Sequence, residues 1–267
     1  MWLINAFSLS LELFYGDDIP SYAILSHTWG AEEVSFREFA KPAPIRNPKL
    51  EEKAGYSKIL ATCRQALEAG LSYVWVDTCC IDKTSSAELT EAINSMFDWY
   101  QRSEICYAYL NDLHLDANNE KPLQGPSTDA SFQQCRWFTR GWCLQELLAP
   151  RHLLFMDHDW RAIGTKASLA PLISDITGIP RALFDSPPKK EIWDCSIADR
   201  ISWIAKRRTT RTEDMSYNLL GILQVNMPML YGEGAAAFLR LQEEVIKKYN
   251  DLSILTYSGV HSVKLHT

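Results

Sequence analysis

The chain has 267 residues, a size that suits one large domain or a core domain with an appendage. Hydrophobic residues make up 46% of it and nine are tryptophan, so a sizeable core is expected. The formal net charge of −6 argues against a general nucleic-acid binder, whose surface would be basic. The sequence has no apolar run of the roughly 18 residues that a membrane span needs, and the apolar N-terminus lacks the basic segment of a signal peptide.

The cysteines indicate the compartment. They are seven, an odd number, and they lie mostly inside apolar runs without any CxxC pair. Cys79 and Cys80 are adjacent, a spacing that suits neither a zinc site nor an easy disulfide. We therefore expect reduced cysteines, no metal and a cytoplasmic location.

Strand patterns alternate with helical patterns up to about Met156, which predicts a parallel α/β sheet. Each predicted helix has an apolar stripe or a recognisable end, such as the capping box formed by Ser85 and Glu88. The predicted strands lie within residues 1–14 and at 22–26, 73–76, 105–110 and 152–156, and the predicted helices of this part lie at 56–69, from 85 to about 100, and at 142–149.

From residue 166 onward the patterns are helical, apart from a predicted turn at 160–164 just before it. We expect an α/β core over residues 1–165 and, over 166–267, an α-helical extension packed on that core. The predicted helices of this extension are 168–177, 196–207, 212–223 and 235–248.

The helix predicted at 142–149 carries a single carboxylate, Glu146, in an apolar and aromatic run. Trp142 and Glu146 are four residues apart and therefore share a face of the helix. Two interpretations stay open. Glu146 is either a structural acid, paired with Arg136 or Arg140, or a functional acid.

Polar residues follow two of the predicted strands. His27 and Trp29 come after the strand at 22–26, and Asp77 comes after the strand at 73–76. In an open α/β sheet, ligands bind at the carboxyl ends of the strands, so these residues are candidates for ligand contacts. The alternatives are a packed Trp29, a loop-orienting His27 and an Asp77 that caps a turn.

A charge-rich turn near residue 210 contains Arg207, Arg208 and Arg211, followed by Glu213 and Asp214. Such a cluster is either a solvated or ion-paired face or a phosphate site, and the sequence favours the first.

Several blocks, in order, resemble those of the heterokaryon incompatibility (HET) domain of filamentous fungi, a family associated with nonself recognition and programmed cell death. The resemblance covers residues 22 to about 243. The blocks are YAILSHTWG (22–30), WVDTCCIDK (75–83), EAINSMF (91–97), CRWFTRGWCLQEL (135–147), RTTRTEDMSYNLLGI (208–222) and YGEG (231–234).

A more distant resemblance bears on chemistry. WCLQEL (142–147) is similar to a segment of plant Toll/interleukin-1 receptor (TIR) domains. In TIR enzymes the glutamate of this segment is the catalytic residue for the cleavage of NAD⁺. The resemblance implies a TIR-like (flavodoxin-like) parallel sheet flanked by helices, with Glu146 as the catalytic residue. The loop at 27–30 departs from the TIR pattern, and the helical extension has no counterpart there.

On this hypothesis NAD⁺ is the substrate and no cofactor is needed. We expect Trp29 and Trp142 to stack on its rings, Ser26, His27 and Asp77 to lie at the ribose or phosphate, and Arg140 to bind the pyrophosphate. A rival set of nucleophiles, Cys79, Cys80 and Cys143, has no histidine nearby in sequence to lower a thiol pKa.

The second hypothesis is a non-enzymatic signalling adaptor that assembles with partner death-inducing domains. On either hypothesis we expect self-association, and an NLR-like receptor or another activating protein as a partner. We expect no nucleic-acid partner.

Overall fold

The computed structural model describes residues 1–41, 48–115, 126–251 and 253–254. Its centre is a seven-stranded sheet with the order β2-β1-β4-β3-β5-β6-β7. The strands are β1 (Trp2–Asn5), β2 (Ser10–Leu13), β3 (Tyr22–His27), β4 (Tyr73–Trp75), β5 (Ile105–Tyr109), β6 (Leu153–Met156) and β7 (Ala162–Thr165).

Four central strands, β4, β3, β5 and β6, run parallel to one another. In chain order they occupy the positions 2-1-3-4, which is the order of a flavodoxin-like doubly wound sheet. The direction of chain progress reverses between β3 and β5, so the carboxyl ends of these strands form a topological switch point. All six residues of β3 are buried, as a central strand covered on both faces requires.

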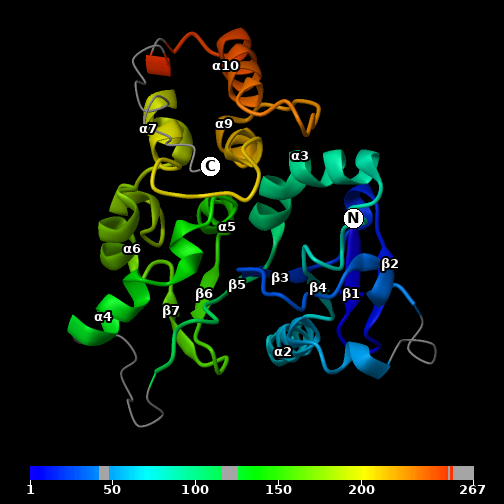
Figure 1. The fold of residues 1–267 in the computed structure, drawn as a ribbon. Helices are drawn as coiled ribbons and strands as arrows, with labels where there is room; N and C mark the ends of the chain where they lie inside the picture. Colours follow the sequence, from blue (N-terminus) through cyan, green and yellow to red (C-terminus); the bar gives the residue numbers. More distant parts are fainter. Residues whose placement is uncertain (42–47, 116–125, 252, 255–267) are drawn as a thin grey trace.

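Helices α2 (Ala54–Glu68) and α3 (Ser86–Arg102) connect the parallel strands. Because the two crossovers run in opposite directions, right-handed connections place these helices on opposite faces of the sheet (Figure 1). On one face the Tyr107 hydroxyl of β5 donates to Gln65 O of α2, 3.0 Å away. On the other, the Tyr100 hydroxyl of α3 donates to Leu25 O of β3, also at 3.0 Å.

The predicted α/β class is confirmed. The strands at 22–26, 73–76, 105–110 and 152–156 and the three helices of the core are also confirmed, with ends that differ from the prediction by about two residues or fewer. The predicted capping box of α3 is confirmed in part: the Ser85 side chain accepts from the backbone N–H of Glu88, but the Glu88 carboxylate accepts from Asp82 N at 2.9 Å. Helix α5 (Cys143–Leu148) is the predicted Glu146 helix. The remaining helices before it are α1 (Phe36–Phe39) and α4 (Pro126–Gln133).

Two sequence predictions for the sheet are wrong. Residues 1–14 form a hairpin of β1 and β2 rather than one strand, and the predicted turn at 160–164 overlaps β7. All pairings of β1, β2 and β7 are antiparallel, so the sheet is mixed. Each of these strands buries at most two of its four residues, so it lacks the buried run that identifies a central strand such as β3.

The C-terminal segment is helical, as predicted, but its helices are shorter. The predicted helix at 196–207 ends at Ser202, and the one at 212–223 is split at residues 218–219. After Ser202 the chain turns to pair with the segment before α5, which prevents the helix from continuing. The helices are α6 (Ala170–Thr177), α7 (Ile197–Ser202), α8 (Asp214–Tyr217), α9 (Leu220–Leu223) and α10 (Ala236–Lys248).

Helix α9 joins this segment to the core by packing against α3 (Figure 1). The contact needs glycine at position 221, because an added Cβ would lie 2.1 Å from Cβ of Phe97. None of the helices in the described ranges is long and apolar enough to cross a membrane.

We predict that Gly221→Ala lowers the free energy of unfolding by about 1–3 kcal/mol, because Phe97 and α9 must separate to admit the methyl group. Urea unfolding measures this change. Gly30→Ala is the matched control, since its added Cβ would meet its nearest neighbour at 3.7 Å. Equal stability of the two variants would contradict the packing described here.

Candidate active site

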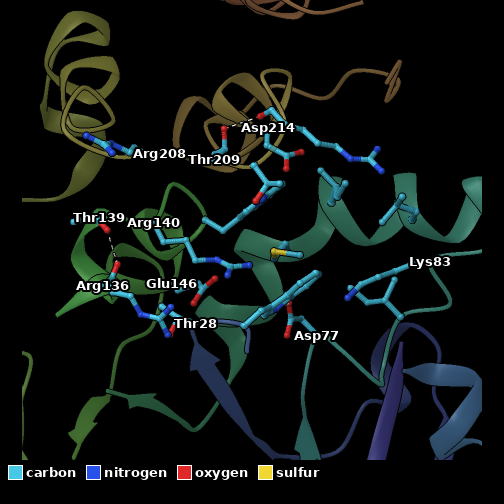
Figure 2. Close-up of a pocket in the computed structure, with 18 of the residues that line it drawn as sticks. Thr28, Asp77, Lys83, Arg136, Thr139, Arg140, Glu146, Arg208, Thr209 and Asp214 are labelled. Atoms are coloured by element: carbon cyan, nitrogen blue, oxygen red, sulfur yellow. Dashed lines mark hydrogen bonds between the residues drawn. The ribbon is translucent and has the colours of Figure 1, made fainter. Parts of the chain in front are cut away.

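A cavity of about 680 Å³ lies at the carboxyl ends of the parallel strands (Figure 2). Its wall comes from two parts of the chain. The core supplies residues after β3 and β4, from α3, and from the segment that leads into α5. The C-terminal segment supplies the turn at 208–211 together with Asp214 and Tyr231.

Glu146 lies in this wall, on helix α5, with only 6% of its surface exposed. The Ser26 hydroxyl donates a hydrogen bond to Glu146 Oε2 at 2.5 Å, and the indole N–H of Trp137 donates to Ser26 Oγ at 2.7 Å. Because Ser26 Oγ accepts from Trp137, its own proton is free to be donated to the Glu146 carboxylate. This chain of donors fixes the position of the Glu146 side chain.

Burial raises the pKa of Glu146, while the Ser26 hydrogen bond and the charge of Arg140 lower it. Burial has the larger effect, and the resulting pKa is about 7. The expected alternative of a structural ion pair is not found. In the described part of the chain no cation lies within 4.0 Å of the carboxylate, and Arg136 instead lies 3.7 Å from Asp112. A buried carboxylate with a raised pKa in a cavity wall is a candidate functional acid.

A second carboxylate, Asp77, lies in the cavity wall after β4. It accepts hydrogen bonds from His27 Nε2 at 3.0 Å and from Trp29 Nε1 at 2.8 Å. Lys58 Nζ donates to His27 Nδ1 at 3.0 Å, so the proton of the imidazole lies on Nε2. Burial lowers the pKa of His27, which keeps this ring neutral.

The charge on Asp77 is maintained by its neighbours. Burial alone would raise its pKa, but the hydrogen bond from His27 and the charge of Lys83 hold the pKa well below the usual range. The ring of Trp29, oriented by Asp77, has Lys83 Nζ at 3.8 Å and Arg140 Cζ at 5.0 Å from its centroid. A ligand ring that stacks on the lysine face must displace that ammonium group.

The C-terminal wall is attached to the core through backbone atoms. Arg208 N donates to Thr139 O at 2.7 Å, and Gly141 N donates to Arg208 O at 2.8 Å. Glycine is required at 141 because an added Cβ would lie 2.5 Å from Asn218 Nδ2 and from Thr209 Cγ2.

Asp214 adds a side-chain contact to this attachment. It accepts hydrogen bonds from the Tyr231 hydroxyl at 3.0 Å and from the side chain of Trp142. Burial raises the pKa of Asp214. The two walls therefore form one site rather than two surfaces that happen to meet.

The structure brings most of the predicted site residues together. Trp29, Asp77, Arg140, Trp142 and Glu146 line the cavity, whereas Ser26 and His27 are buried behind it. The latter two support the carboxylates Glu146 and Asp77 and do not reach the cavity themselves.

Sequence reasoning missed several lining residues, among them Lys83, Asp214 and Tyr231, and assigned Arg136 only as a partner for Glu146. The sequence held a weak indication of these four residues, because each lies within one of the blocks that resemble the HET domain.

The rival cysteine nucleophiles are absent from the cavity wall. All seven cysteines are buried and free, and burial raises the pKa of Cys79 and Cys143 well above the ordinary thiol value. A thiol in this state is a poor nucleophile. Among the described residues, no group of three or more His, Cys, Asp or Glu side chains is placed to hold a metal ion.

Known proteins are similar to this chain in sequence. The family model for heterokaryon incompatibility protein (HET) matches residues 22–128. The chain is 47% identical over 234 residues to the vegetative incompatibility protein HET-E-1 of Podospora anserina. That alignment covers 86% of this chain and 16% of the relative, so the chain spans about a sixth of the relative's length. No solved structure matches the chain.

The raised pKa of Glu146 predicts a pH-dependent stability. A group whose pKa is higher in the folded state stabilises that state below its unfolded pKa, here 4.5, and the contribution is lost as the pH rises through about 7. The loss amounts to about 3 kcal/mol. Because glutamine does not titrate, we expect Glu146→Gln to gain stability relative to wild type by about this amount between pH 4.5 and 8.

Urea unfolding at several pH values measures the difference, with Glu68→Gln on the exposed surface of α2 as control. A constant difference between Glu146→Gln and wild type across this range would show that the carboxylate is not desolvated.

Proposed function

This chain carries a heterokaryon incompatibility (HET) domain, and we propose that it is a cell-death effector of fungal vegetative incompatibility that cleaves NAD⁺ at the nicotinamide–ribose bond. The observation that carries the proposal is the buried Glu146 carboxylate, which faces a cavity of nucleotide size and has no cation bound to it in the described structure. The TIR-like resemblance of residues 142–147 supports the same assignment.

The chemistry needs one carboxylate. Nicotinamide in NAD⁺ is already a cationic leaving group, so its departure requires no general acid. As the C1′–N bond lengthens, its electron pair moves to the nicotinamide nitrogen and positive charge develops on the ribose. The ionised Glu146 stabilises that charge. The oxygen of a water molecule then bonds to C1′ and releases its proton, and the products are nicotinamide and ADP-ribose.

The neighbouring groups have distinct roles in this proposal. Ser26 and Trp137 position Glu146 without touching the substrate. Asp77 has a free lone pair on each oxygen for a ribose hydroxyl, even with His27 and Trp29 bound. Arg140 supplies positive charge near the phosphates, and Trp29 and Trp142 offer aromatic surface to the rings.

One observation favours the second candidate function, a non-enzymatic adaptor. Helix α10 exposes Leu239 and Ile246, which are 62% and 54% exposed and seven residues apart, and therefore share a face. Such side chains suit self-association or contact with an activating protein such as an NLR-like receptor. In an enzyme the same surface would assemble the active oligomer, so the two functions differ only in their requirement for Glu146.

We predict that Glu146→Gln abolishes nicotinamide release, a loss of at least about 10²-fold, because glutamine keeps the shape of the site but carries no charge. The assay compares NAD⁺ consumption by wild type, Glu146→Gln and the surface control Glu68→Gln, each fused to an oligomerising coiled coil. Wild-type turnover in Glu146→Gln would exclude Glu146 as the catalytic carboxylate. Undiminished toxicity of Glu146→Gln in cells would favour the adaptor.

The rate of cleavage should also depend on pH. Because the ionised form of Glu146 is the active one and its pKa is about 7, the rate should rise between about pH 6 and 8. Ser26→Ala removes the hydrogen bond that lowers this pKa, so the midpoint should move up by about one unit. A midpoint that stays in place in Ser26→Ala would mean that another group controls the rate.

A further inference from the structure

The turn at 208–211 has the sequence Arg-Thr-Thr-Arg, and all four of its residues line the cavity. Arg208 and Arg211 are exposed, and in the described part of the chain neither lies within 4.0 Å of a carboxylate. Guanidinium and hydroxyl groups are typical donors to phosphate oxygens, and this turn carries two guanidinium groups with the Thr210 hydroxyl beside them. The proposed cleavage assigns no role to them.

The turn is held in place from both sides. Its first residue, Arg208, is bonded through its backbone to Thr139 and Gly141. Within the turn, the Thr209 hydroxyl donates to Arg211 O at 2.6 Å. The preceding Arg207 is buried and donates from Nη1 to Arg140 O at 3.0 Å. The donors of the turn are thus presented by a fixed backbone, and Figure 2 shows Arg208 and Thr209 across the cavity from Asp77.

The charge of the cavity is opposite to that of the protein. The whole chain has a net charge of −6, yet the cavity wall carries five cationic residues and three acidic ones. Of the five, Arg136 alone has a carboxylate within 4.0 Å among the described residues. Lys83, Arg140, Arg208 and Arg211 therefore gather at one site without an ion pair inside 4.0 Å in the described part of the chain, although Asp77 lies close enough for Lys83 and Arg140 to lower its pKa. Their mutual repulsion is relieved when an anion of two or more charges binds.

We infer that the turn at 208–211 binds the diphosphate of the substrate, together with Arg140 on the segment paired with Arg208, and so restricts the substrate to diphosphate-bridged nucleotides. Arginine contacts phosphate in a bidentate manner, and the Thr210 hydroxyl can supply a further donor, whereas the Thr209 hydroxyl already donates to Arg211 O and holds the turn. The inference rests on the proposed function only in placing a ribose of this ligand beside Glu146. It gives the C-terminal segment a direct part in substrate binding.

The test measures equilibrium binding of ADP-ribose to the Glu146→Gln protein by calorimetry, so that turnover does not interfere. Arg208→Ala and Arg211→Ala should each weaken binding by about tenfold or more, because each removes a charge-assisted contact. Nicotinamide riboside, which has no phosphate, should bind with unchanged affinity in both variants. Arg64→Ala, an exposed arginine of α2 outside the cavity, is the matched control.

Both substitutions should fold normally, because the side chains are exposed and the backbone bonds of Arg208 remain. Arg208→Lys and Arg211→Lys keep the charge but lose the bidentate geometry, and should lie between alanine and wild type. Unchanged ADP-ribose affinity in the alanine variants, no measurable ADP-ribose binding, or equal weakening of ADP-ribose and nicotinamide riboside would overturn the inference. If wild type does not cleave NAD⁺ but ADP-ribose binding depends on both arginines, the proposed function fails and the diphosphate site stands.

Discussion

The hydrogen-bonded chain from Trp137 through Ser26 to Glu146 is the interaction on which the site depends. It brings a carboxylate of α5 to the end of β3 and satisfies that carboxylate without a cation. A salt bridge at this point would neutralise the charge that the proposed chemistry needs, whereas a hydroxyl donor orients it and leaves it available. The carboxylate is desolvated in this position, and its pKa is therefore raised to about 7.

The second constraint is the backbone pairing of Arg208 with Thr139 and Gly141. It brings residues some 70 positions apart to the same cavity and ties the helical extension to the segment that carries Arg140. The resulting site has two unlike walls. The core wall contributes the carboxylates Glu146 and Asp77, and the C-terminal wall contributes the arginines of the turn at 208–211. A dinucleotide, with a reactive sugar at one end and a diphosphate in the middle, matches that division.

Sequence reasoning predicted what local pattern determines. The central strands, their helices and the placement of Trp29, Asp77 and Glu146 at strand ends or on α5 follow from apolar periodicity and from the position of the turns. The antiparallel strands β1, β2 and β7 were not predicted as separate strands, because each buries at most two residues and so lacks the buried run of a central strand. Ser26 and His27 were expected to meet the ligand, but burial within or at the end of β3 turns them toward Glu146 and Asp77. The role of the turn at 208–211 depends on its long-range pairing with residues 139–141, which no local pattern contains.

The central claim is that one cavity holds the ribose at Glu146 and the diphosphate at the turn of the C-terminal segment. A crystal structure of the Glu146→Gln protein with NAD⁺ bound tests it most directly. We predict density for the nicotinamide ribose with C1′ beside the residue 146 side chain and phosphate oxygens within hydrogen-bonding distance of Arg208 or Arg211. NAD⁺ bound elsewhere on the protein, or bound in this cavity with its ribose turned away from residue 146, would contradict the account.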